Sequence, residues 1–254
     1  MNQVFLPKDL QPSLCRTLKR LGKDFDGGYV IDSRNIEISD RLIGLGMNDD
    51  WSFEEHFVNL HKIPTYIFDG TVGQSRFIKN LILSIIRIDN LSLLFHWIKT
   101  VFKYHFFFKG STKHIKLLVD DMKGEEFISF HDLVEKYFLE EDKKVFLKID
   151  IEGSEYRLLD HLVHISDKIS GMVIEFHNVD LNIDKIIRFT NNFSLKLCHV
   201  HINNYGGVNK SDVPIAIECT YSSSTFNSSE VASCPNEIDM PNNPQSQDLQ
   251  IIFN

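Results

Sequence analysis

Short apolar segments rich in β-branched residues alternate along the chain with segments of helical periodicity, and this alternation constrains the fold most strongly. We expect strands at 41–46, 65–69, 105–108, 145–150, 171–177, 195–202, 215–221 and 249–253. We expect helices at 75–104, 130–138, 154–162 and 180–191. A further helix is expected to start at Ser52, which has capping-box spacing to Glu55. The pattern predicts a doubly wound, Rossmann-like α/β fold with a mainly parallel sheet, helices on both faces and an antiparallel strand near the C-terminus.

Composition bounds the domain organisation and the class of partner. The chain has 254 residues, and we expect a single domain over 1–254 with a helical, basic and apolar insertion at about 75–104. The net charge of −8 does not favour a nucleic-acid partner. The four cysteines form no CxxC pair, so no structural zinc site is expected. No signal-peptide pattern and no long apolar run is present, so the cytoplasm is the expected compartment.

Two glycines close the first expected strand. Gly44 and Gly46 lie before a helix start, where glycine lets the backbone approach a ligand and N–H groups are unpaired. Asp49 stands in place of the third glycine of a dinucleotide fingerprint, and its charge would repel a pyrophosphate. An acidic loop suits the cationic cofactor S-adenosylmethionine better, and a simple tight turn is the alternative. Asp69 closes the second strand, where an acid either accepts hydrogen bonds from a ribose or caps a turn.

Three pairs of polar residues stand at the carboxyl ends of three expected strands, with one residue between the members of each pair. The pairs are Asp150 with Glu152, Glu175 with His177, and His201 with Asn203. Alternate residues of a strand face the same side, and the carboxyl ends of strands line the ligand crevice of an open α/β sheet. The pattern therefore predicts one cleft lined by acids, imidazoles and an amide.

Two chemistries are open for this cleft. In the first, His177 or His201 is the general base that activates a substrate hydroxyl. In the second, a hard divalent cation such as Mg²⁺ or Mn²⁺ binds and acidifies the hydroxyl. The candidate ligands of that cation are Asp150, Glu152, Glu175 and His177.

The stretch LKIDIEGSE at 147–155 resembles the signature of FkbM-type methyltransferases. Shorter similar segments are Asp26-Gly-Gly-Tyr29, which also reads as a hairpin turn, Ser52-Phe-Glu54 and His201-Ile-Asn-Asn204. The resemblance spans about residues 20–254. It implies an O-methyltransferase that uses S-adenosylmethionine and acts on a hydroxyl of a saccharide or a related small molecule.

The resemblance also implies roles for single residues. Gly44, Gly46 and Asp69 would hold the cofactor, and Asp150 would lie near the transferred methyl group. Together with the polar pairs, this gives Asp150, Glu175, His177 and His201 as the candidate catalytic residues. The chain departs from the family at Gly70, where a histidine is expected, and in the insertion at 75–104.

Other function classes fit parts of the same pattern. A nicotinamide-dependent sugar oxidoreductase would use the same glycines and acid. A metal-dependent glycosyltransferase would use Asp150 and Glu152 as its metal-binding pair. A non-catalytic Rossmann-like scaffold would keep the fold without ligand-dependent stabilisation.

The segment from Arg76 to Lys116 is unusually basic. It contains eight basic residues and one acid, Asp89, interleaved with apolar and aromatic residues. Such a segment suits peripheral contact with a membrane through residues 76–116, or an anionic substrate such as a sugar nucleotide or a lipid-linked glycan. The alternative is a helical lid packed on the domain, with its lysines in solvent. A homodimer is the expectation for the oligomeric state, because twofold dimers are the commonest oligomers.

Overall fold

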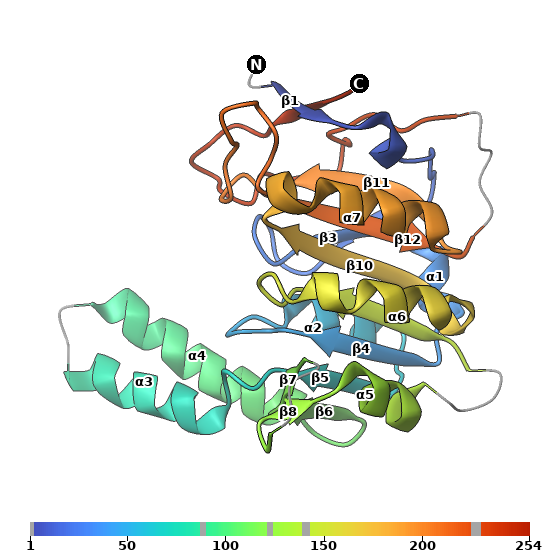
Figure 1. Ribbon diagram of the computed structural model, residues 1–254. Coiled ribbons are helices and arrows are strands. Elements are labelled where there is room, and N and C mark those ends of the chain that lie inside the picture. Colours follow the sequence, from blue (N-terminus) through green and yellow to red (C-terminus); the bar gives the residue numbers. More distant parts are fainter. Residues whose placement is uncertain (1–2, 87–89, 121–123, 139–142, 225–229) are drawn as a thin grey trace.

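A seven-stranded sheet forms the centre of the protein (Figure 1). The computed structural model describes residues 3–86, 90–120, 124–138, 143–224 and 230–254. The strands lie in the order β11-β12-β10-β9-β4-β5-β6. Their bounds are β4 Arg41–Leu45, β5 Thr65–Phe68, β6 Thr112–Ile115, β9 Val145–Ile149, β10 Ile169–His177, β11 Lys196–Ile202 and β12 Ala216–Ser222.

The direction of the strands matches the predicted fold class. All neighbouring strands are parallel except β12, which runs antiparallel to both β10 and β11. In chain order the first five strands follow the 3-2-1-4-5 arrangement of a doubly wound sheet, and β12 is then inserted ahead of β11. The strand order reverses between β4 and β9, which makes the carboxyl ends of these strands the expected ligand crevice.

Helices cover both faces of the sheet. On one face lie α5 Phe130–Tyr137, α6 Leu159–His164 and α7 Val179–Asn192 (Figure 1). On the other face lie α1 Arg34–Glu37, α2 Ser52–Leu60 and a hairpin of β2 Leu18–Leu21 with β3 Tyr29–Asp32. The prediction of a mainly parallel sheet between two helical layers is confirmed.

Side chains of β9 alternate between the two faces of the sheet, so this strand contributes to both hydrophobic cores. Leu147 and Ile149 belong to the apolar cluster beneath α5, α6 and α7. Phe146 points to the opposite face, where its ring packs 4.9 Å from that of Phe57 and 6.2 Å from that of Phe53. Lys148 shares this second face because side chains alternate along a strand.

Two helices, α3 Gln74–Ile86 and α4 Leu91–Phe107, form a hairpin that projects from one side of the sheet (Figure 1). They account for the helical segment expected at 75–104. The strand expected at 105–108 is wrong, because these residues end α4 and the strand β6 follows at 112–115. Tyr104 and Phe108 pack on Trp51, with ring centroids 5.8 and 5.5 Å away. Packing therefore overrides the β propensity of the Phe106–Phe108 run.

The capping box at the start of α2 is a second correction. The helix does begin at Ser52, but its N-cap residue is Trp51, whose side chain makes no capping hydrogen bond, and the backbone N–H of Ser52 donates to Asp50 Oδ1 at 3.1 Å. The Ser52 hydroxyl instead accepts a hydrogen bond from the backbone N–H of Lys23, at 3.0 Å. The side chain of Ser52 thus ties the β2–β3 turn to α2.

The C-terminal region lies outside the main sheet. β13 Gln250–Phe253 pairs in parallel with β1 Gln3–Leu6. The remaining elements are η1 Lys8–Leu10, β7 Leu118–Val119, β8 Phe127–Ile128, η2 Glu155–Arg157 and η3 Ser166–Lys168. The helix expected at 154–162 is therefore split between η2 and α6. The predicted loop at 222–247 carries no helix or strand over its described part after Ser222, although 225–229 lie outside the described residues.

None of the described helices combines the length and apolar character needed to cross a bilayer.

Removing the Phe146 ring tests the packing of the second core. Phe146 is fully buried, so Phe146→Ala is expected to lower the free energy of unfolding by about 3–5 kcal/mol. Urea unfolding followed by circular dichroism measures this loss. Phe95→Ala is the matched control, because that ring is 66% exposed, and its effect is expected to stay within about 0.5 kcal/mol. Equal losses in the two variants would contradict the assignment of Phe146 to the core.

Candidate active site

A cavity of about 970 Å³ opens at the carboxyl ends of β4, β5, β9 and β10. Its lining is strongly acidic, with nine carboxyl side chains against three lysine and arginine side chains. The acids are Asp26, Asp49, Asp50, Glu54, Asp69, Asp120, Asp150, Glu152 and Glu175, and the cations are Lys23, Arg76 and Lys148. The predicted crevice at the strand ends is therefore present.

The glycine loop, which begins at Gly46 after β4, lies against the end of β9. β9 is the neighbouring strand at the point where the strand order reverses. Gly46 has a φ of +82°, and a Cβ atom there would lie 1.8 Å from the carbonyl oxygen of Asp150. Only glycine fits this contact. Gly44 has a different role from the predicted one. It is not among the residues that line the cavity, and a Cβ at this position would lie 2.8 Å from Glu54 Oε1, so Gly44 makes room for the side chain of Glu54.

Asp69 anchors the glycine loop. One carboxylate oxygen accepts hydrogen bonds from the backbone N–H groups of Met47 and Asn48, at 3.0 and 2.9 Å. The other accepts from the N–H and hydroxyl of Thr71, at 2.8 and 2.6 Å. Burial acts to raise the pKa of Asp69, but these hydrogen bonds outweigh it and hold the pKa below its usual value. Asp69 lines the cavity as predicted, yet its acceptor sites are already filled by protein donors.

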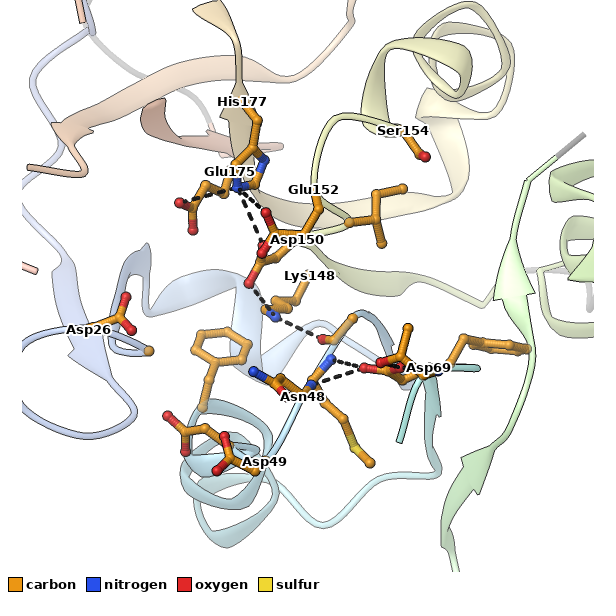
Figure 2. Close-up of a pocket in the computed structure, with 18 of the residues that line it drawn as sticks. Asp26, Asn48, Asp49, Asp69, Lys148, Asp150, Glu152, Ser154, Glu175 and His177 are labelled. Atoms are coloured by element: carbon orange, nitrogen blue, oxygen red, sulfur yellow. Dashed lines mark hydrogen bonds and ion pairs between the residues drawn. The ribbon is translucent and has the colours of Figure 1, made fainter. Parts of the chain in front are cut away.

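Three predicted residues meet at the opposite side of the cavity. Figure 2 shows Asp150, Glu175 and His177 pointing toward one another. His177 Nε2 lies 4.0 Å from Asp150 Oδ1 and 3.7 Å from Glu175 Oε1. Glu152 also approaches, with an oxygen 3.5 Å from His177 Nε2, but its side chain is 86% exposed. Glu152 lies in the turn after β9 with a φ of +53°, so the i, i+2 rule for strands does not hold for this pair.

Neutral and cationic donors hold the two carboxyl groups in place. The Tyr29 hydroxyl donates to Asp150 at 3.1 Å and to Glu175 at 3.3 Å. The Asn203 amide donates to Glu175 Oε1 at 2.7 Å. Lys148 Nζ lies 3.3 Å from Asp150 and donates to the carbonyl oxygen of Gly46 at 2.8 Å. Lys148 thereby links the acidic cluster to the glycine loop.

Glu155 orients the imidazole from outside the cavity. This fully buried carboxylate accepts a hydrogen bond from the backbone N–H of His177 at 2.6 Å, and its Oε1 lies 3.3 Å from His177 Nδ1. Its other oxygen accepts from the N–H of Gly153 at 2.7 Å. A carboxylate on Nδ1 leaves Nε2 facing the cavity.

The cluster holds protons at neutral pH. Burial raises the pKa of Glu175 to about 8, and the negative charge of Asp150 adds to this effect. Burial acts to lower the pKa of His177, but the hydrogen bond with Glu155 and the charge of Glu175 raise it to about 9. Burial also acts to raise the pKa of Asp150, but the positive charge of Lys148 holds it below its usual value. The ionised carboxylate of the cluster is therefore that of Asp150.

His201 is not part of this site. Its side chain is 1% exposed and lies between Glu218, at 3.4 Å, and Asp248, at 3.1 Å, and His201 does not line the cavity. The physical reason is the sheet order, since β12 separates β11 from β10 and neighbouring strands are about 4.8 Å apart. Asn203 follows the end of β11 and reaches back to Glu175, so only this member of the predicted pair meets the cluster.

Four residues of the site were not assigned roles from the sequence: Tyr29, Glu54, Lys148 and Glu155. All four belong to the segments that resemble FkbM-type methyltransferases. Burial raises the pKa of Glu54 to about 7, and its Oε1 atom has no hydrogen-bond partner. A lysine within the apolar strand 145–149 is the one signal that pattern analysis offers, because a buried cation requires a partner.

The end of the cavity beyond Asp69 is apolar. It is lined by Phe68, Leu118, Val119 and Phe127. Asp120, next to this wall, binds Arg157 Nη1 at 2.6 Å. The cavity therefore combines an apolar end, a backbone loop in the middle and a polar, acidic end.

Comparisons with known proteins give only weak similarity. No protein-family model matches the chain, and no curated protein does so either. Among solved structures, the METTL16 MTase domain aligns with a TM-score of 0.39 and 8% identity over 76% of this chain and 63% of that chain. TYW2 of M. jannaschii in complex with AdoMet aligns at 0.35 and 8%, over 82% and 87% of the two chains. A putative methyltransferase from Thermoplasma acidophilum aligns at 0.32 and 11%, over 81% and 71%. Similarity this low carries no conclusion about function.

The buried imidazole of His201 gives a prediction for stability. Burial acts to lower the pKa of His201, but the hydrogen bonds with Asp248 and Glu218 raise it from 6.5 to about 10. The folded state therefore binds more protons than the unfolded state between these values. The stabilisation is complete below pH 6.5 and is lost as the pH rises through about 10.

Urea unfolding of the wild type at several pH values between 6.5 and 10 is expected to show this decline in stability. His201→Gln is expected to make the decline shallower, and the raised pKa values of His177 and Glu175 account for the part that remains. The exposed His131→Gln serves as the control and is expected to retain it. A wild-type stability that stays constant over this range would show that His201 is not protonated in the folded protein.

Proposed function

We propose that the protein is an S-adenosylmethionine-dependent O-methyltransferase that acts on a hydroxyl of a saccharide or a related small molecule. The observation that carries the proposal is the excess of acids in the cavity lining, nine carboxyl side chains against three lysine and arginine side chains, beside a glycine loop. A cofactor with a sulfonium and an ammonium group is attracted by this lining, whereas the pyrophosphate of a dinucleotide would be repelled.

The shape of the cavity suits the three parts of such a cofactor. The apolar wall of Phe68, Leu118 and Val119 would receive the adenine ring. The loop at 46–48, which Asp69 holds in position, would lie along the ribose. A ribose hydroxyl would bind Asp69 only by replacing one of its present donors. The acidic side around Asp150 would then face the charged sulfur and amine.

The chemistry follows from the cluster at the other end. When bound, S-adenosylmethionine supplies a methyl group that its positively charged sulfur has already activated. The acceptor oxygen would attack the methyl carbon as the carbon–sulfur bond breaks. Glu175 and His177, once deprotonated, would act as one pair that accepts the single proton of the acceptor hydroxyl, since His177 Nε2 lies 3.7 Å from Glu175 Oε1. Tyr29 and Asn203 hold Glu175 in place, and Glu155 holds His177. The protein contributes mainly position and a proton acceptor.

A hydroxyl-rich acceptor suits the polar mouth beside the cluster. Asp26, Ser154, Asn203 and the 61% exposed Tyr205 lie there. These side chains offer both donors and acceptors of hydrogen bonds. This lining supports a saccharide over an apolar acceptor.

The same cluster also fits a divalent cation. One ligand atom from each of Asp150, Glu175 and His177 lies within 4.8 Å of the others. These residues would hold Mg²⁺ or Mn²⁺, since two of the three ligands are carboxylates. The cation would lower the pKa of the acceptor hydroxyl. Lys148 already lies beside Asp150, so the proposed transfer does not depend on the metal. Methyl transfer that persists in EDTA would exclude an essential cation, and loss of transfer that added Mn²⁺ restores would show that a cation is required.

Binding of the cofactor is the first test. Isothermal titration calorimetry is expected to show one site for S-adenosylmethionine in the wild type. Gly46→Val is expected to abolish binding because its side chain would collide with the Asp150 carbonyl, and Asp69→Ala is expected to weaken it by about tenfold because the loop loses its anchor. Asp184→Ala, an exposed acid on α7, is the control and should bind as the wild type does.

Other ligands distinguish the competing functions in the same assay. Binding of a nicotinamide dinucleotide in place of S-adenosylmethionine would assign an oxidoreductase. Stabilisation by a sugar nucleotide with Mn²⁺ alone would assign a glycosyltransferase that uses Asp150 and Glu152. A fold that none of these ligands stabilises would indicate a scaffold.

The pH profile of methyl transfer tests the proton acceptor. Glu175 and His177 must lose a proton before they can accept one, so kcat/KM is expected to rise with pH through the range of about 8 to 9 set by the pair. His177→Gln is expected to lower kcat by about a hundredfold or more and to flatten this rise. The exposed His105→Gln is expected to change neither. A His177→Gln enzyme with an unchanged profile would rule out this role.

A further inference from the structure

The far end of the α3–α4 hairpin exposes many large apolar side chains. They are Ile82, Leu83, Ile85 and Ile86 on α3 and Leu91, Leu93 and Phe95 on α4, each 40–73% exposed. In Figure 1 this end of the hairpin points away from the sheet. Single exposed apolar residues are common, but a group of this size marks an interaction surface.

The exposed residues are not those that hold the hairpin together. Phe77 is buried in the seam between the helices, and its ring stacks on Trp97 with centroids 6.2 Å apart. Ile78, Ile82 and Ile85 recur at helical spacing on a different face of α3 and are 40–52% exposed. α3 therefore has one apolar face for α4 and a second that nothing in the described part of the chain covers.

The charge of the hairpin indicates an anionic partner. The two helices contain no aspartate or glutamate, and their basic residues include Arg76, Lys79, Lys99 and Lys103. In the sequence, the link at 87–89 adds one arginine and one aspartate, which balance. The whole chain has a net charge of −8, so the hairpin differs in sign from the rest of the protein.

Lys79 and Lys99 lie at similar distances from the tip of the hairpin. Lys79 precedes Ile86, and Lys99 follows Leu91, by about two helical turns each, or roughly 11 Å along the axis. Apolar side chains of surface-bound helices enter a membrane to a depth of about 5–10 Å. With the tip at this depth, both lysines reach the level of the lipid head groups.

We propose that the α3–α4 hairpin docks the protein on an anionic lipid surface, with its apolar tip in the membrane and its lysines on the head groups. A second copy of the chain is the less suitable partner. Two basic hairpins carry charge of the same sign and so offer each other no charge complementarity, whereas an anionic lipid surface does.

The hairpin adjoins the cavity at its base, through Arg76, and part of the way along α4, through His96. Arg76 lines the cavity and donates to the carbonyl oxygen of Thr71 at 2.7 Å. His96 Nε2 lies 2.9 Å from Asp49 in the glycine loop. Docking would therefore bring the cavity to the lipid surface, where a saccharide attached to a lipid is within reach. This last consequence, unlike docking itself, rests on the proposed function.

Co-sedimentation with vesicles tests the docking. The full chain is mixed with vesicles of phosphatidylcholine, with or without phosphatidylserine. We expect binding that requires phosphatidylserine and weakens as salt is added. Ile86→Ser is expected to weaken binding on the order of tenfold. Lys79→Gln with Lys99→Gln is expected to weaken it about fivefold per lysine.

Matched controls separate the tip from general surface effects. Leu181→Ser replaces an equally exposed apolar residue on α7, at 78% against 73% for Ile86. Lys196→Gln with Lys210→Gln removes two exposed lysines elsewhere. Both controls are expected to bind as the wild type does, and circular dichroism confirms that every variant is folded.

Three results would overturn the proposal. The first is no sedimentation of the wild type with phosphatidylserine vesicles, and the second is equal binding by Ile86→Ser. The third is a dimer in sedimentation velocity that Ile86→Ser disrupts, without any binding to vesicles, which would assign the tip to a second copy. S-adenosylmethionine is absent from these assays, so their outcome is independent of the proposed catalytic function.

Discussion

The site depends on the close approach of Gly46 to Asp150 at the point where the strand order reverses. The backbone N–H of Asp150 donates to Leu45 at 2.9 Å, and a Cβ on Gly46 would lie 1.8 Å from the Asp150 carbonyl oxygen. Lys148 stabilises the same junction by donating a hydrogen bond to the Gly46 carbonyl oxygen. Because of this contact, a loop suited to a cofactor and a carboxylate suited to chemistry lie side by side.

Around this junction, the protein keeps an unusual number of acids together by surrounding them with donors. Asp69 receives four hydrogen bonds, and Glu175 receives hydrogen bonds from Tyr29 and Asn203. Glu54, by contrast, is buried with an oxygen that has no partner, and its pKa is raised to about 7. Concentrated negative charge of this kind is costly to fold, and it is reasonable where a cationic ligand offsets it.

Pattern analysis was most successful where burial is continuous. The strands at 145–150 and 171–177 were predicted from the apolar runs Val145–Leu147 and Met172–Ile174, each followed by one charged residue within the strand. It was wrong at Phe106–Phe108, whose aromatic side chains favour a strand but pack on Trp51 as the end of α4. It also grouped His201 with Glu175 and His177, because strand spacing gives the face of a side chain but not the distance between strands.

The sequence by itself determined the fold class, the acidic glycine loop and three members of the cluster, Asp150, Glu175 and His177. These follow from local periodicity and from the rule that strand ends share one edge of a sheet. Only the tertiary structure decided that Gly44 serves Glu54, that Asp69 anchors the loop, and that His201 lies two strands away. Those roles depend on the order and spacing of strands distant in the chain, which a one-dimensional pattern does not specify.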